Sequence, residues 1–233
     1  VPLARLIFKF STMRTSWLKI LGLVLVGVAI VAGLLGPVPA LPILHETIRN
    51  VYFHVPMWFT MLTLYLISVI YSIKYLNTGK ESYDLLAVEA VNTGIIFCGM
   101  GLLTGMLWAN ITWGEPWPND PKLNGSAIAT LMYLAYLVLR NALEEEQKRA
   151  KISAIYNIFA FPVMIVLLYI LPKLTDSLHP GSGGNGTFGD LDMDNQMRPI
   201  FYSAVIGWIL IGTWICTLRY RLRLLENKKN QID

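Results

Sequence analysis

The chain has 233 residues, of which 55% are hydrophobic and 15% charged, and its mean hydropathy is +0.51. Soluble domains carry about 25% charged residues, so a deficit gathered in long apolar runs predicts an integral membrane protein. The formal net charge of +4 is small, and the Lys and Arg residues flank apolar runs instead of forming a basic stripe. This pattern excludes a nucleic-acid-binding protein.

Six apolar segments are candidates for membrane-crossing helices, because about 20 helical residues cover roughly 30 Å of hydrocarbon. In chain order they are residues 17–35, 57–75, 86–108, 126–139, 152–171 and 199–218. The fourth is the shortest, and Pro162 is expected to kink the fifth. We therefore predict an all-α fold in which residues 1–233 form a single membrane domain, a bundle of six transmembrane helices.

The positive charges divide unevenly between the two sets of connecting segments. One set, which includes both termini, carries 15 of the 19 Lys and Arg residues. The other set carries only Arg49, Lys122, Lys173 and Arg198. Because Lys and Arg concentrate on the cytoplasmic side of a membrane, the poorer segments, 36–56, 109–125 and 172–198, are predicted to face outward. Both termini are then predicted to be cytoplasmic, as an even number of spans requires.

The outward segment 109–125 and the residue before it are unusually aromatic. The run reads Trp108-Ala-Asn-Ile-Thr-Trp-Gly-Glu-Pro-Trp-Pro-Asn-Asp-Pro-Lys-Leu123. Tryptophans often serve only as anchors at the membrane interface, which accounts for Trp17, Trp58 and Trp208. Here, however, prolines fix an irregular backbone, which is tolerated near the bilayer where it is buried or lines a cavity. We interpret the run as an aromatic shelf for a flat apolar ligand.

All three histidines, His45, His54 and His179, lie in the outward segments. His54 directly precedes the second span, and His179 follows the fifth. Each alone could be an ordinary interfacial residue, but two outer imidazoles beside an aromatic shelf can supply both axial ligands of a haem iron. His45 lies in a polar turn and is the weaker candidate. The sequence contains no Cys-x-x-Cys-His motif, so we predict non-covalent binding of haem b.

The two propionates of haem require cations. Arg49 lies close to His54 in the sequence, and Lys122 lies in the aromatic run. Either side chain could pair with a carboxylate, although each could equally be an ordinary flanking charge.

Four stretches of the chain carry a family resemblance. They are Val51-Tyr-Phe-His-Val-Pro56, Leu103-Thr-Gly105 leading to Trp113-Gly-Glu-Pro-Trp-Pro-Asn-Asp-Pro-Lys-Leu123, Leu174-Thr-Asp-Ser-Leu-His179 and Met197-Arg-Pro199. In this order, they resemble haem-handling protein C of cytochrome c maturation, within the wider family of membrane haem-handling proteins with a tryptophan-rich outer loop.

The resemblance implies roles for residues that match the family pattern. His54 and His179 would be the iron ligands, and the loop would be the haem shelf. In the loop the chain keeps Trp113, Gly114, Trp117, Asp120 and Leu123. It has Asn119, Lys122 and Asn124 where the family usually has Trp, Arg and Thr. These differences remove one aromatic face and replace a bidentate cation by a point charge.

We therefore expect a protein of the bacterial plasma membrane that holds haem on its outer, periplasmic face and has no catalytic activity of its own. The resemblance implies transfer of the haem to a membrane-tethered haem chaperone, with subunits of an ABC-type transporter as associated partners. One alternative is a small cytochrome b-like electron-transfer subunit, although no histidine is predicted at bilayer depth. Another is a transporter subunit for haem, but mid-span polar residues are limited to Asn92 and to Glu89, which is expected to snorkel. A ligand-free scaffold is the third.

Overall fold

The computed structural model describes residues 16–41, 44–179 and 193–230. Within them the chain is helical and contains no strand, which confirms the predicted all-α class. The elements are α2 (Ser16–Leu35), η1 (His45–Asn50), α3 (Val51–Thr78), α4 (Glu81–Trp113), α5 (Pro121–Asn141), α6 (Glu146–Ile165), η2 (Val166–Ile170), α7 (Leu171–Leu174) and α8 (Met197–Asn230). Residues 1–15 of the predicted cytoplasmic N-terminus, and 180–192 of the predicted segment 172–198, lie outside the described residues.

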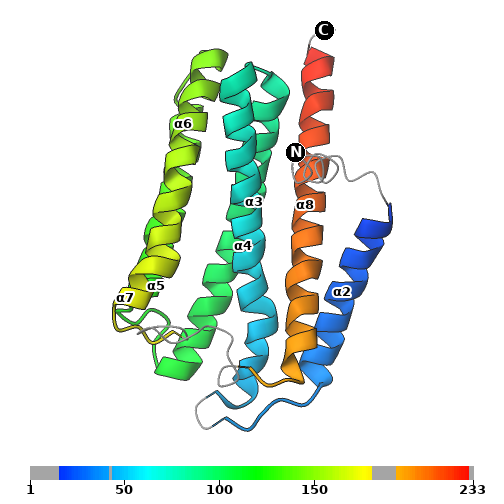
Figure 1. Ribbon diagram of the computed structural model, residues 1–233, viewed down its shortest axis with the longest axis vertical. Helices are drawn as coiled ribbons and strands as arrows, with labels where there is room; N and C mark the ends of the chain where they lie inside the picture. Colours follow the sequence, from blue (N-terminus) through cyan, green and yellow to red (C-terminus); the bar gives the residue numbers. More distant parts are fainter. Residues whose placement is uncertain (1–15, 42–43, 180–192, 231–233) are drawn as a thin grey trace.

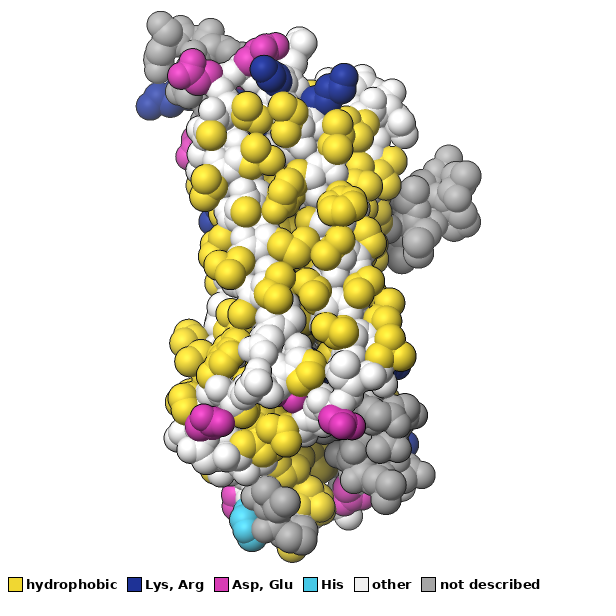
Figure 2. Space-filling model, turned by 90° about the vertical axis from the view of Figure 1, so that its left-hand side faces the viewer, with side chains coloured by type: hydrophobic (Ala, Val, Ile, Leu, Met, Phe, Trp, Pro, Cys, Tyr) yellow, Lys and Arg dark blue, Asp and Glu magenta, His cyan; other side chains and the backbone are white. Residues whose placement is uncertain are grey.

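Six of the helical stretches are long and apolar enough to cross a membrane, as predicted. They run up and down along one axis, so that α2 begins and α8 ends toward the same end of the bundle (Figure 1). A broad band of apolar side chains covers the face in Figure 2, between charged ends. Exposed residues such as Leu131 on α5 and Phe159 on α6 are suited to contact with lipid. The protein is therefore a multi-pass membrane protein.

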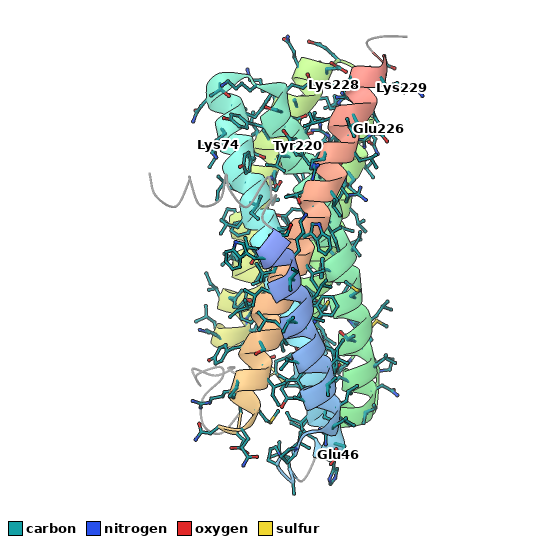
Figure 3. The ribbon with its side chains drawn as sticks, turned by 90° about the vertical axis from the view of Figure 1, so that its right-hand side faces the viewer. Glu46, Lys74, Tyr220, Glu226, Lys228 and Lys229 are labelled. Atoms are coloured by element: carbon teal, nitrogen blue, oxygen red, sulfur yellow. The ribbon has the colours of Figure 1, made fainter. Side chains whose placement is uncertain are left out.

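At one end of the bundle, α2 and α4 finish and α3, α5 and α8 begin. We call this the cavity end, after the cavity described below. Figure 3 shows Glu46 there, whereas Lys74, Glu226, Lys228 and Lys229 lie toward the opposite end. In the arrangement of the helices, α3 packs along α4, α2 packs against α8, and α5 pairs with α6 (Figure 1).

The aromatic connection is shorter than the expected loop 109–125. Residues 109–113 continue α4, which ends where Gly114 adopts a left-handed conformation (φ 86°) that glycine tolerates. Residues 121–125 form the first turn of α5. Pro121 suits the first helical position, and the Asp120 side chain caps the turn by accepting hydrogen bonds from the Lys122 and Leu123 amides. Only residues 114–120 are therefore non-helical.

Buried polar contacts join the helices toward the opposite end. Arg140 of α5 forms a bidentate ion pair with Asp84 of α4. Glu89 of α4 is only 2% exposed and accepts a hydrogen bond from Arg219 of α8 at 2.8 Å. The expectation that Glu89 snorkels was therefore wrong. Its carboxylate is buried against Arg219, which is 130 residues away in the sequence and could not be recognised as a partner. These pairs compensate charges that would otherwise be costly to bury.

Candidate ligand-binding cavity

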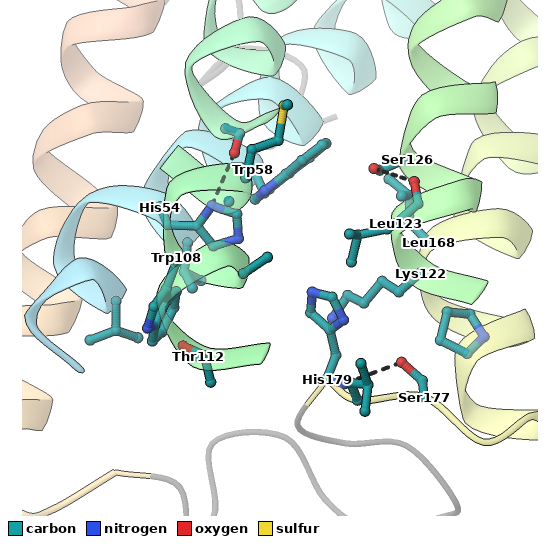
Figure 4. Close-up of a pocket in the computed structure, with 18 of the residues that line it drawn as sticks. His54, Trp58, Trp108, Thr112, Lys122, Leu123, Ser126, Leu168, Ser177 and His179 are labelled. Atoms are coloured by element: carbon teal, nitrogen blue, oxygen red, sulfur yellow. Dashed lines mark hydrogen bonds between the residues drawn. The ribbon is translucent and has the colours of Figure 1, made fainter. Parts of the chain in front are cut away.

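A cavity of about 610 Å³ opens at the cavity end, between α3 and α4 on one side and α5, η2 and α7 on the other (Figure 4). Its lining is largely apolar and aromatic, and includes Trp58, Trp108, Trp113 and Trp117. His54 enters from α3 and His179 from the segment after α7, and both line this one cavity. A cavity of this size with a few polar groups is typical of a small-molecule or cofactor site.

His54 is fixed against α4 through its ring nitrogen Nδ1. This atom lies 3.0 Å from the carbonyl oxygen of Gly101 and 3.2 Å from the hydroxyl of Thr104. Because a carbonyl oxygen can only accept, Nδ1 carries the proton, and in the neutral ring Nε2 keeps a free lone pair. The rings of Trp58 and Trp108 stand edge-on to the imidazole, with centroids 6.2 and 5.9 Å away.

Gly105 allows the close approach of the imidazole to α4. A Cβ atom at this position would lie 2.7 Å from Cε1 of His54, too close for ordinary packing. The sequence Leu103-Thr-Gly105 thus positions His54 from the facing helix, through the small size of Gly105 and the hydroxyl of Thr104.

His179 is held in the same tautomer by an acidic partner. Its Nδ1 lies 3.1 Å from Oδ1 of Asp120, and a carboxylate accepts the proton that Nδ1 donates. Its backbone N–H donates to the hydroxyl of Ser177 at 3.2 Å, and its ring centroid lies 5.0 Å from that of Trp113. Nε2 of His179 is therefore also left with a lone pair. A carboxylate or carbonyl partner on the second nitrogen is the usual support for a metal-binding histidine.

Asp120 is a supporting residue buried behind His179. The residue is 1% exposed and is absent from the cavity lining. Its carboxylate accepts hydrogen bonds at 2.7 Å from the Ser177 hydroxyl and the Leu178 amide. Burial alone would raise the pKa of Asp120, but hydrogen bonds from His179, Ser177 and Leu178 outweigh it and hold the pKa below its usual range. Burial lowers the pKa of His179, against the opposing effect of Asp120, which favours the neutral imidazole that a metal requires.

The other predicted site residues fall into two groups. Trp108, Trp113, Trp117 and Lys122 line the cavity. Gly114 does not line it and instead ends α4.

Arg49 also lies outside the cavity lining. Its guanidinium donates to the carbonyl oxygens of Gly33 and Gly36 at 2.9 and 2.6 Å and pairs with Glu46 at 2.7 Å. The side chain thus satisfies carbonyl groups at the end of α2, which the final turn of a helix leaves without partners.

Among the lining residues that were not predicted as site candidates, an aromatic one and a cation stand out. Trp58 was expected to be an interface anchor, but it lines the cavity. Its spacing of four residues from His54 on one helix face was the available signal. Lys173 of α7 lines the cavity together with Lys122, and no sequence signal distinguished it from a flanking charge.

A second cavity of about 660 Å³ lies toward the opposite end. Its lining contains no histidine among the described residues, and it includes charged side chains that pair with one another, Arg140 with Asp84 and Arg149 with Glu146. The described part of the chain also contains no cluster of three or more His, Cys, Asp or Glu side chains suited to a metal ion. The two imidazoles of the first cavity are therefore the distinctive chemical feature.

Fold and site together define a polytopic membrane protein with two imidazoles in a tryptophan-lined cavity at one end of a helical bundle. The family model described as CcmC, heme exporter protein C, matches residues 3–233. The chain belongs to this family.

Individual relatives agree with the family assignment. Heme exporter protein C of Paracoccus denitrificans is 24% identical over 182 residues, covering 78% of this chain and 75% of the relative. The protein of the same name from Rhodobacter capsulatus is 26% identical over 191 residues, covering 80% and 77%. Cytochrome c biogenesis protein CcsA of Prochlorococcus marinus (strain NATL1A) is 34% identical over 93 residues, covering 40% of this chain and 28% of the relative.

Proposed function

We propose that this protein holds haem b non-covalently as a cargo in the cavity between His54 and His179 and presents it for cytochrome c biogenesis. The observation that carries the proposal is the pair of imidazoles that line one cavity, each with Nδ1 hydrogen-bonded to an acceptor and Nε2 left for a ligand. Two such nitrogen atoms are what haem iron takes as axial ligands. The relatives named heme exporter protein C and cytochrome c biogenesis protein support the assignment.

The rest of the lining suits the remainder of a haem molecule. Trp108, Trp113 and Trp117 offer apolar ring surface to a porphyrin. Lys122 and Lys173 are the cations that line the cavity within the described residues, and we assign the propionates to them. Arg49, the other predicted propionate partner, already binds the carbonyl oxygens at the end of α2.

The charge distribution and the family support a direction of transfer. The cavity end carries the segments poor in Lys and Arg, so it is assigned to the periplasmic side of the bacterial plasma membrane. The acceptor is assigned as a membrane-tethered haem chaperone, in a complex with ABC-type transporter subunits. His54 lies on a helix, whereas His179 lies in the non-helical segment after α7. We therefore assign release to His179, the ligand that can move with less cost.

Absorption spectroscopy of purified protein tests the proposal. A reduced-minus-oxidised spectrum of a six-coordinate b-type haem, extractable by acid acetone and confirmed by pyridine haemochrome, is expected. The haem should also pass to a purified apo-chaperone when the two proteins are mixed. Protein that retains its haem in the presence of this acceptor would support the cytochrome b-like alternative, and protein that binds no haem would support the scaffold.

A further inference from the structure

Trp117 is hydrogen-bonded to Asn124 of α5, and Asn124 is in turn hydrogen-bonded to Asn119 in the connection 114–120. The indole N–H of Trp117 donates to Oδ1 of Asn124 at 3.2 Å. The Asn124 amide nitrogen in turn donates to Oδ1 of Asn119 at 2.9 Å. Trp117 lines the cavity, while Asn119 is exposed.

The direction of this chain is fixed by chemistry. An indole N–H can only donate, so Asn124 must turn its oxygen toward Trp117. Its NH₂ group therefore faces Asn119, which must answer with its own oxygen. The otherwise ambiguous orientation of both amides is thus determined by the tryptophan.

The chain ties the aromatic surface to the helical turn that carries the other polar groups of the site. Trp117 lies in the non-helical connection 114–120, where the backbone alone does not hold the ring against a helix. Asn124 belongs to the first turn of α5, and its N–H donates to the carbonyl oxygen of Asp120 at 2.9 Å. This same turn contains Lys122, which lines the cavity. Trp117, Lys122 and the Asp120 support of His179 therefore share one rigid base.

We propose that Asn124, held in place by its hydrogen bond to Asn119, is a positioning residue that sets the plane of the Trp117 ring against the planar ligand. The inference rests on the proposed haem-binding function. It assigns a role to the two amides, neither of which lines the cavity.

Four variants test the direction of the chain. Asn124→Leu has similar size and offers no acceptor to the indole. Asn124→Asp keeps this acceptor, and the Asn119 amide can rotate to donate to the new carboxylate. Asn119→Asp keeps the acceptor for Asn124. The double variant Asn119→Asp/Asn124→Asp places two carboxylates face to face with no donor between them. Asn195→Leu, an exposed asparagine near the cavity end, is the matched control.

Two readouts separate the inference from the proposed function. Ultraviolet resonance Raman spectra of the haem-free protein, with Trp117→Phe as the subtraction reference, report the hydrogen bond of the Trp117 N–H. Haem titration reports the dissociation constant and the Soret position. Circular dichroism and thermal melting identify any variant that fails to fold. If Asn124→Leu does not fold, the double variant compared with the two single Asp variants keeps the test decisive.

Asn124→Leu is expected to lose the hydrogen-bonded indole band and to bind haem about 3–10-fold more weakly, as the loss of one net hydrogen bond implies. The double variant should do the same, because repulsion between its two carboxylates turns the side chain at position 124 away from the indole. Both should also shift the Soret band. Each single Asp variant should instead keep a haem dissociation constant within about twofold of the wild-type value. Loss of the indole band with unchanged haem affinity and Soret position would overturn the positioning role. A band unchanged in Asn124→Leu would overturn the hydrogen bond itself. Wild-type protein that binds no haem would overturn the proposed function, and with it the role toward haem, while the Raman result still stood.

Discussion

Oδ1 of Asp120 lies 3.1 Å from Nδ1 of His179, and the same carboxyl group caps the first turn of α5. One buried side chain thus joins the start of a helix to a proposed iron ligand 59 residues later in the sequence. The conformation of the connection between α4 and α5 and the orientation of the His179 imidazole are consequently coupled.

Asp120→Asn is expected to weaken haem binding by about 10–100-fold, the usual range for a residue that orients a metal-binding histidine. The amide turns one acceptor into a donor, although Asp120 is surrounded by groups that donate to it. Haem titration of the purified variant measures the effect. Asp194→Asn, an exposed carboxylate near the cavity end, is the control. Equal affinities for wild type and Asp120→Asn would show that Asp120 does not support the ligand.

Gly105→Ala is expected to disturb His54 without unfolding the bundle. The added Cβ would meet Cε1 of His54 at 2.7 Å, whereas a Cβ on Gly99 of the same helix would meet nothing within 4 Å. Alanine also favours a helix over glycine by about 1 kcal/mol, so Gly99→Ala should melt at or slightly above the wild-type temperature and keep its Soret band. Gly105→Ala should show a shifted or weakened band. A wild-type spectrum from Gly105→Ala would mean that His54 does not ligate from this position.

Lys122→Gln and Lys173→Gln should each weaken binding of haem, and the double variant more, because the propionates lose their cations. Titration with haem dimethyl ester provides the control, since wild type and variants should bind this neutral form equally. Arg49→Gln should instead lower the melting temperature through the lost contacts at the end of α2. The quantity to compare is the difference in affinity between haem and its dimethyl ester. If Arg49→Gln reduces this difference more than the lysine variants do, the propionates would be reassigned to Arg49.

Trp58→Ala should weaken haem binding, while Trp17→Ala should leave it unchanged. Trp58 stands beside His54 in the cavity lining, whereas Trp17 is 60% exposed on α2 and fits an interface anchor. Dissociation rates of haem to an excess of apomyoglobin compare the two variants. Equal rates would indicate that both tryptophans serve the membrane interface only.

The six helices could be predicted from the sequence because apolar length is a local signal. The two histidines were singled out from their place in the outward segments, and the structure brings both to one cavity. The rotation of each helix about its axis could not be predicted, because it has no local signal in the sequence. This rotation decides which residues share the cavity. Trp58 lines the cavity, and Gly105 lies against the imidazole of His54, because of the way α3 packs on α4. Long-range partners were hidden for the same reason, as Arg49 with the carbonyls of Gly33 and Gly36 illustrates.

The most direct test of the central claim is the Soret spectrum of the double variant His54→Ala/His179→Ala, purified and titrated with haem beside His45→Ala. His45 does not line the cavity, so its variant should give the wild-type six-coordinate spectrum. The double variant should lose it entirely, and each single variant should give a weaker band of altered ligation. A double variant with the wild-type spectrum and affinity would contradict the account.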